Sequence, residues 1–418
     1  MGIEVEATCS PQVERKVIAA STSCTSHAHT REQLRTLAEI DIGEKRCARM
    51  VQRVGSERVR QREQRWEDYQ ALPLPETKTA PADAPLGGWD HRVAVVMADG
   101  GRIQLRDERW GTPRKEGEKK RSWWREPKVA LVATFASESH DADPMPEVPE
   151  CLHDPLWLIP RINAIKAATG GDAAAEEVQE TASTASVPPA DSASPADRRH
   201  EWSPSPLVRS VVSTLQPYAH LGRLAKVEAY HRGFSAASRK AFVADGLQSN
   251  WTIHQTQFSD YTPITDLMHA LTYVYKAAKE STDDMEECWT RCQAWVTCVW
   301  QGKVTCVIDA IDGLLVGLID ESVREPLLEV RGYLKNNQDR MKYDQYRSCG
   351  LPITTALMES TIKQTNRRMK GTEKFWLDGA EPQSQLCADS LSETRPLDNY
   401  WRERSENATG FRKSRANR

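Results

Sequence analysis

The sequence lacks the features that mark membrane and exported proteins. Its longest apolar run, residues 304–319, contains Asp309 and Asp312, so it does not indicate a membrane span. The first residues contain no apolar segment typical of a signal peptide, and Glu6 stands where the myristoylation pattern requires Ser or Thr. We therefore expect a cytoplasmic protein.

The sequence also lacks the cysteine spacing of a structural zinc site. Its ten cysteines are scattered and include no Cys-x-x-Cys pair, so we expect reduced thiols and no structural zinc. Cys288, Cys292 and Cys298 lie close together within a tryptophan-rich helical pattern, and this spacing indicates packing in a core.

Neither sign of charge is in large excess. There are 56 basic and 59 acidic side chains among 418 residues, giving a formal net charge of −3. This balance excludes a uniformly basic surface for nucleic acid but allows local basic patches. The length allows two or three domains.

Near the N-terminus the pattern predicts two short helices, residues 31–39 and 44–54, joined by a turn. The lengths of the two helices and the turn between them are typical of a helix-turn-helix, in which Arg46, Arg49 and Arg53 could contact a phosphate backbone. A plain helical hairpin explains the same pattern equally well. A charged helix and a proline-rich linker follow.

Three strands are predicted next. Residues 93–99 are apolar without alternation, as in a strand covered on both faces, and the run ends at Asp99. Two glycines then allow a tight turn into a returning strand, residues 102–107. A cationic loop, residues 114–125, precedes a third strand at 128–135. Short connections predict an antiparallel meander.

The middle of the chain changes character twice. Residues 137–205 include a stretch rich in Ala, Ser, Thr, Glu and Pro, which predicts a flexible insertion. A helical pattern follows over 207–233, and short strands are then predicted at 240–244 and 261–265. Residues 280–340 are predicted to be helical, with apolar and aromatic residues spaced as in a core.

Residues 350–376 read as one helix that begins near Pro352. Met358, Ile362 and Met369 share an apolar stripe, and a polar strip beside it contains the acid Glu359. The helix also carries the cations Lys363, Arg367, Arg368 and Lys370, which could contact bound phosphates. Considered alone, Glu359 and Lys363 are an ordinary pair one helical turn apart.

Further acids change that interpretation. Asp245 and Asp266 each end a predicted strand, as Asp99 does, and ligands of α/β sheets collect at strand ends. Carboxylates that converge there suit Mg²⁺, and two such ions can hold the attacking and leaving oxygens of a phosphodiester. For any single Asp-Gly pair, a turn is the simpler explanation.

Four stretches carry a family resemblance: VVMADGGRIQLRD, FVADGLQSNWTIH, ITDLMHALTYVYKAA and RMKYDQYRSCGLPITTALMESTIKQTNRRMKGTEKFW. The chain resembles bacterial insertion-sequence transposases of the ISKra group and, more distantly, Mutator-type transposases. The resemblance implies an RNase H-like α/β (α+β) catalytic domain interrupted by an all-α insertion.

The resemblance also implies a DDE triad of metal ligands, Asp99, Asp245 and Glu359. Asp266 and His269 match the D-x-x-H signature of these families. Because Asp266 also closes a strand, it competes with Asp245 for the second ligand position, and the family order favours Asp245. For His269, a contact near the scissile phosphate and a purely structural role both remain open.

The implied function is DNA transposition, in which element 3′ ends are cut and joined to target DNA. The implied cofactors are two Mg²⁺ or Mn²⁺ ions, and the implied partners are the terminal inverted repeats, target DNA and further copies of the chain assembled on DNA. The protein would then be nucleoid-associated. Two alternatives remain: a decayed or domesticated DNA-binding protein, and a general RNase H-like nuclease.

The expected organisation is as follows: an N-terminal helical region (1–85), the first half of the core (88–136), a flexible insertion (137–205), the second half of the core (206–279), an all-α insertion (280–345), the glutamate helix (346–385) and a polar basic tail (386–418).

Overall fold

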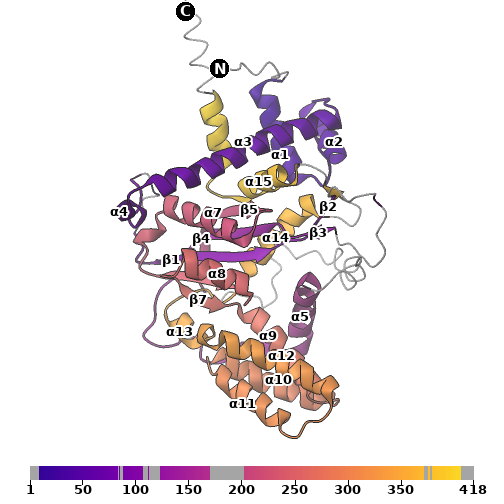
Figure 1. Ribbon diagram of the computed structural model, residues 1–418, viewed down its shortest axis with the longest axis vertical. Helices are drawn as coiled ribbons and strands as arrows, with labels where there is room; N and C mark the ends of the chain where they lie inside the picture. The colour runs from indigo at the N-terminus through magenta and orange to yellow at the C-terminus, as the bar shows by residue number, and fades with distance from the viewer. Residues whose placement is uncertain are drawn as a thin grey trace, which may run out of the picture.

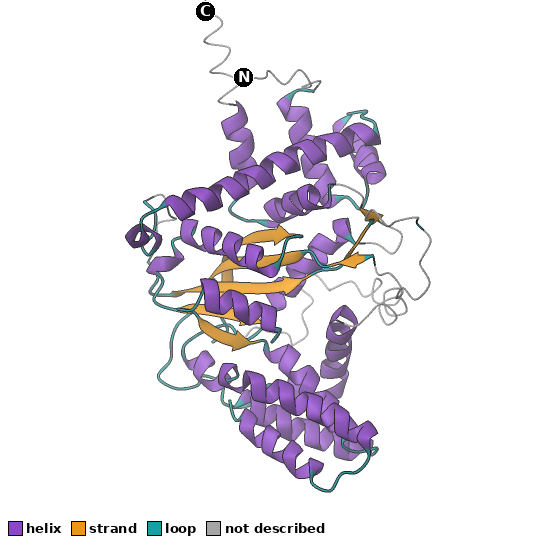
Figure 2. Cartoon of the chain, in the orientation of Figure 1, coloured by secondary structure: helices purple, strands orange, loops and turns teal. Residues whose placement is uncertain are grey.

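The computed structural model describes residues 9–82, 84, 88–106, 112, 123–169, 202–370, 375–376 and 379–405. Its centre is a mixed sheet covered by helices on both faces (Figures 1 and 2). A layer of N-terminal helices lies beyond one edge of this sheet, and a bundle of helices lies beyond the other. The predicted mixed α/β class is confirmed in this general form.

The central sheet has five strands in the order β5-β4-β1-β6-β7. Strands β5, β4 and β1 are antiparallel, and β1, β6 and β7 are parallel. Their bounds are β1 Arg92–Gly100, β4 Lys128–Ala136, β5 Ser205–Thr214, β6 Lys240–Ala244 and β7 Thr262–Thr265.

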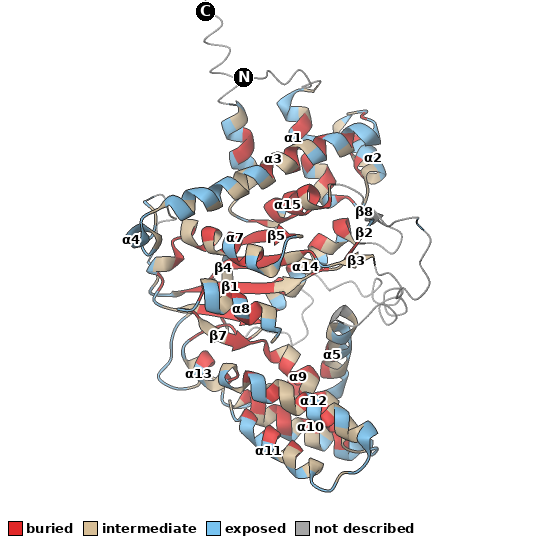
Figure 3. Ribbon diagram, viewed as in Figure 1, coloured by how far each residue is buried: buried red, intermediate tan, exposed pale blue. Residues whose placement is uncertain are grey.

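Strand β1 is the centre of the sheet and is covered on both faces, as its apolar sequence predicts. Val95 and Met97 pack into one core cluster, and Ala94 and Val96 pack into another. All four side chains are buried, and β1 lies deep in the molecule (Figure 3).

The predicted returning strand does not pair with β1. The antiparallel partner of β1 is β4, whereas β2 (Ile103–Leu105) joins β3 (Trp124–Arg125) and β8 (Phe375–Trp376) in a separate sheet. Ile103 is fully buried beside Met369, which draws this segment away from the central sheet. The predicted meander is therefore wrong at its second strand.

The predicted helix over residues 207–233 is wrong in its first half. Residues Ser205–Thr214 form β5, and helix α7 begins only at Tyr218, after Pro217. The segment extends because the backbone pairs with β4, and because the Val211 N–H donates to Ser392 Oγ at 2.8 Å. Long-range pairing overrides the local pattern here.

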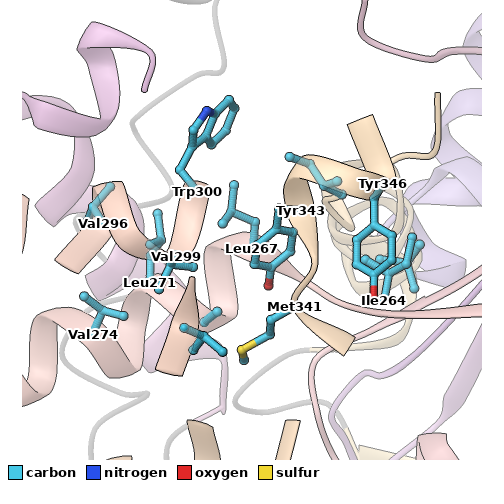
Figure 4. Packing of buried hydrophobic residues seen from close by; sticks show 14 of the residues in the cluster. Ile264, Leu267, Leu271, Val274, Val296, Val299, Trp300, Met341, Tyr343 and Tyr346 are labelled. Carbon is cyan, nitrogen blue, oxygen red and sulfur yellow. The ribbon is translucent and has the colours of Figure 1, made fainter. Parts of the chain in front are cut away.

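Six α-helices lie between β6 and residue 350 among the described residues. They are α8 Gln248–Gln257, α9 Leu267–Glu280, α10 Met285–Trp300, α11 Val304–Leu315, α12 Glu321–Asn337 and α13 Tyr343–Ser348. Three of them, α10 to α12, fall in the range 280–340 that was predicted to be helical. Leu267 and Leu271 of α9 pack with Val299 and Trp300 of α10 and with Tyr343 (Figure 4). Cys288 and Cys292 are buried in the same cluster, and all ten cysteines are free thiols.

Part of the segment predicted to be a flexible insertion is helical. Helix α5 spans Pro155–Thr169, and its Leu158 and Ile162 are fully buried in the main core beside α9. The apolar residues of this part were outweighed by the polar composition of the whole segment. Most of the Ala/Ser-rich stretch, residues 170–201, lies outside the described residues.

The N-terminal helices are α1 Pro11–Ser23, α2 His27–Ala38, α3 Glu44–Ala71 and the short α4 Leu74–Thr77. Helix α3 runs through Gly55, where Pro382 approaches so closely that a Cβ would lie 2.5 Å from its carbonyl oxygen. The two helices of the predicted helix-turn-helix exist, and α1 packs against both.

The predicted polar tail is largely structured. Helix α15 (Ala380–Leu391) is buried between α3 and β5, and residues 396–405 are also helical. Tyr400 and Trp401 are buried against Ile18 and Val54. Among the described residues, no helix is both long enough and apolar enough to cross a membrane.

Helix α14 carries Glu359 and spans Ala356–Met369, so it begins after the predicted Pro352. The residues directly before it are not helical, and there the Leu267 N–H donates to the Ile353 carbonyl and the Thr355 N–H donates to Asp266. Met358 and Met369 are fully buried, as the predicted apolar stripe requires.

Candidate active site

Three aspartates stand in one row at the ends of adjacent parallel strands. Strand β1 pairs Met97 with Val243 of β6, so two residues further on Asp99 stands opposite Asp245. Strand β6 pairs Ala244 with Thr265 of β7, which places Asp266 beside Asp245. The parallel register therefore brings these three acids together.

Asp99 and Asp245 line a cavity of about 910 Å³ between the sheet and the helical insertion. The cavity is also lined by residues of α5, α9 and α12, and by residues in and next to the three-stranded sheet β3-β2-β8, called the small sheet below. Its cations are Arg102, Arg125, Lys166, Lys276 and Lys279. Carboxylates and cations thus line the same cavity.

Asp99 is the most perturbed acid of this site. Burial and the neighbouring Asp245 carboxylate raise the pKa of Asp99 to about 7, although the Gly100 N–H donates to its Oδ1 at 2.7 Å. Two carboxylates held this close repel one another, so one of them favours its protonated form unless a cation is present.

Asp245 is held in place from two sides. Its Oδ1 accepts hydrogen bonds from the Leu247 N–H at 3.1 Å and from Asn250 Nδ2 at 2.9 Å. Its backbone carbonyl accepts a bond at 3.0 Å from the hydroxyl of Tyr333, on α12 of the helical insertion. The insertion therefore contacts the second acid directly.

Tyr333 is itself locked. Its ring stacks on Tyr273 of α9 at a centroid distance of 3.6 Å and an angle of 9°. Gly246 has a φ of +100°, and a Cβ there would lie 2.8 Å from the Tyr333 ring. The Asp-Gly pair at the end of β6 is thus required both for its backbone conformation and for the space that Tyr333 fills.

Asp266 differs from the other two aspartates because it is fully buried and its carboxylate is occupied. Oδ1 accepts bonds from the N–H groups of Met268 and Thr355, and Oδ2 accepts from the Thr355 hydroxyl at 3.0 Å and from His269 Nδ1 at 2.6 Å. This residue caps α9 and links it to the start of α14. The geometry favours Asp245 over Asp266 as the acid that faces the cavity.

His269 lies on the cavity wall and is oriented by Asp266. Burial lowers the pKa of the imidazole, but the hydrogen bond and charge of Asp266, with Asp245 and Asp99, outweigh it and raise the pKa to about 9. At neutral pH the ring is therefore cationic, and both of its nitrogens are donors.

Glu359 lies on the half-buried face of α14, which packs against β1 and β4. Burial and Asp266 raise the pKa of its carboxyl, whereas Lys363 and His269 lower it. Glu359 is thus an electrostatic neighbour of the Asp266–His269 pair, but it does not line the cavity that holds Asp99 and Asp245.

The cations predicted to contact DNA divide into two groups. Lys363 and Arg367 are exposed on α14, and Arg46 and Arg49 are exposed on α3. Lys370 is half-buried, with its Nζ 5.9 Å from the centroid of the Trp124 ring. The proposed DNA contacts of these five residues stay predictions.

Two of the predicted cations have structural roles instead. Arg368 is buried and donates to the Thr25 carbonyl and to Gln383 Oε1, so its prediction as a DNA contact is wrong. Arg53 pairs with the buried Glu14 of α1. The helical pattern does not reveal these partners because they lie far away in the sequence. Most of the predicted cationic loop lies outside the described residues, because the structure describes only 123–125 of its residues 114–125.

Sequence reasoning missed Glu126, an additional acid on the cavity. Its Oε1 accepts a hydrogen bond from the Tyr218 hydroxyl at 2.7 Å, and its side chain lies so close to Gly100 that no Cβ fits there. It also raises the pKa of Asp99. Its place after a cationic loop carried no signal of this role.

The donor chemistry of the site fits a hard divalent cation. Asp99 and Asp245 offer carboxylate oxygens, and the mutual repulsion that raises the pKa of Asp99 is the kind that such an ion relieves. Within the described parts of the chain, no group of three or more His, Cys, Asp and Glu side chains is arranged to hold a metal as it stands.

Comparison with models of known protein families and with curated protein sequences gives no match for this chain.

Proposed function

We propose that the chain is a DDE-type DNA transposase of an insertion sequence, with an RNase H-like core interrupted by the helices of residues 280–345. The observation that carries the proposal is the register of Asp99 with Asp245 on adjacent parallel strands, above a cavity lined by cations. The mixed sheet, with three antiparallel strands followed by two parallel ones, is compatible with such a core.

In this proposal Asp99 and Asp245 hold divalent cations, with Glu359 as the third acid. When bound, such ions lower the pKa of an attacking water or 3′-hydroxyl and stabilise the departing oxygen. His269, cationic and fixed by Asp266, donates a hydrogen bond to a phosphate oxygen. Asp266 keeps the histidine ring oriented and protonated.

The first experiment measures strand cleavage of labelled duplex that carries the ends of the element, with Mg²⁺ present. Wild type should cut, and Asp99→Asn should not. Equal nicking by both would favour the decayed or domesticated DNA-binding protein. Unlabelled duplex of unrelated sequence is then added as a competitor. If it inhibits cutting as strongly as unlabelled element ends do, the general nuclease is favoured.

The identity of the third acid is tested with two matched variants. Glu359→Gln should reduce cleavage by more than about 100-fold, the upper end for outer-shell partners of a metal, and should leave DNA binding intact. Glu126→Gln removes one negative charge as well, in this case from the cavity wall, and should reduce cleavage less. The reverse order would assign the third position to Glu126 and return α14 to a scaffolding role.

A further inference from the structure

Three lysines lie on one wall of the cavity that contains Asp99 and Asp245. Lys166 comes from α5, and Lys276 and Lys279 come from α9, one helical turn apart. The Lys166 Nζ lies 5.7 Å from the centroid of the Tyr275 ring, so its side chain is directed along α9. We call these three residues the lysine wall.

Holding these charges together is costly in the isolated protein. Burial, Lys279 and Lys276 lower the pKa of Lys166, which reports the repulsion between them. The acids Glu280 and Glu329 offset part of it, and Lys276 Nζ lies 2.5 Å from Glu329 Oε2. Because that ion pair is partly exposed, it is easily exchanged for another anion.

The small sheet supplies cations from another side of the same cavity. Arg102 and Arg125 line it, and the Arg102 guanidinium lies 5.4 Å from the centroid of the Trp124 ring. The aspartates therefore share this space with two cationic groups that come from separate parts of the chain. A polyanion with regularly spaced charges could engage both groups and bring a linkage between them to the acids.

We propose that the lysine wall binds the phosphate backbone of the DNA strand that is processed at Asp99 and Asp245. The wall and the small sheet then contact phosphates on either side of the reacting linkage. This placement rests on the proposed function, whereas the binding itself does not require catalysis. Helix α5 thereby becomes part of the substrate site.

The test measures binding of fluorescently labelled duplex by anisotropy in EDTA, at salt concentrations from about 50 to 200 mM, the range over which phosphate contacts change affinity most clearly. The variants are Lys166→Gln, Lys276→Gln and Lys279→Gln, singly and together. The matched control is Lys335→Gln, which removes the same charge from an exposed site on α12 away from the cavity. Thermal unfolding checks that each variant is folded.

Each effective lysine should lower the slope of log affinity against log salt by about 0.9. Replacing the same three lysines by arginine keeps their charge, so these variants should have the slope of wild type. A triple variant that binds like Lys335→Gln would overturn the proposal, and so would displacement of the duplex by inorganic phosphate at the same phosphate concentration as unlabelled DNA.

Cleavage assays separate this inference from the proposed function. If wild type cuts and Asp99→Asn does not, while the triple glutamine variant binds normally, only the lysine wall is wrong. If nothing cuts but the triple variant loses its salt dependence, the wall stands and the transposase proposal fails.

Discussion

Asp99 and Asp245 face one another because their strands are parallel neighbours in register. Burial, together with repulsion by Asp245, makes Asp99 the clearest electrostatic signal in the cavity, with a pKa raised to about 7. A carboxyl whose pKa is raised by folding favours the folded state only while it is protonated. Its cost to stability therefore grows as the pH rises from about 4, the ordinary pKa of Asp, and is complete above about 7.

Replacing Asp99 by Asn tests this residue without a catalytic assay. At pH 8 in EDTA the variant should be more stable than wild type, with a free energy of unfolding higher by on the order of 1–3 kcal/mol. It should therefore unfold at a higher temperature. At pH 4, near the ordinary pKa of Asp, the two should converge because the wild-type carboxyl is then protonated in the folded protein. Calorimetry at both pH values measures the difference, and an equal effect at both would contradict the charge repulsion.

Mg²⁺ provides the control for that measurement. It should raise the unfolding temperature of wild type at pH 8 and leave Asp99→Asn nearly unchanged, because the variant has lost one donor oxygen.

Arg368 and Lys363 show the limit of residue-scale prediction. Both lie on α14 and were predicted to contact DNA, yet Arg368 is buried and Lys363 is exposed. The difference arises because the connection between α1 and α2, the start of α2, and α15 provide partners for the guanidinium of Arg368. The helical period places the two side chains on different faces, but only the tertiary structure shows that the face of Arg368 is covered.

At the scale of elements, the helical insertion does more than fill space. Tyr333 of α12 bonds to the carbonyl of Asp245, and Tyr343 of α13 bonds to the carbonyl of Thr265, next to Asp266. These hydroxyls hold the ends of two neighbouring strands. The sequence predicted a helical core here, but it did not predict contact with the acids.

Tyr333→Phe should therefore reduce cleavage about 5-fold and stability by about 1 kcal/mol, the usual value of one hydrogen bond. Its ring still stacks on Tyr273, so the fold should be preserved. Cleavage kinetics and denaturant unfolding measure the two effects.

Tyr230→Phe is the matched control because the ring of Tyr230, on α7, packs against Tyr69 of α3 and lies outside the cavity lining. If the two variants behave alike, Tyr333 does not position Asp245.

At the scale of the whole molecule, the two ends of the chain close on one another. Tyr400 and Trp401 of the helical segment 396–405 are buried against Ile18 of α1 and Val54 of α3. Helix α15 lies between α3 and β5, so the N-terminal helices rest on the core through C-terminal residues. The N-terminal region is therefore packed against the rest of the described chain.

Trp401→Ala should cost about 3–5 kcal/mol, because it leaves a cavity at this junction. Thermal unfolding measures the loss, and Arg402→Ala, exposed on the same helix, should cost less than about 0.5 kcal/mol. Equal effects would mean that this segment is not part of the folded unit.

The sequence by itself determined the elements with strong local patterns: the apolar strand β1, the strand ends at Asp99, Asp245 and Asp266, the helices of the insertion and the buried stripe of α14. Only the tertiary structure decided which elements pair and what lies beside each acid. Strand β5 is extended because β4 pairs with it, α5 is ordered because Leu158 and Ile162 meet α9, and Glu126 reaches the cavity through the turn before β4. Hydrogen bonding between strands and burial between distant segments join residues far apart in the chain, and local periodicity carries no record of those partners.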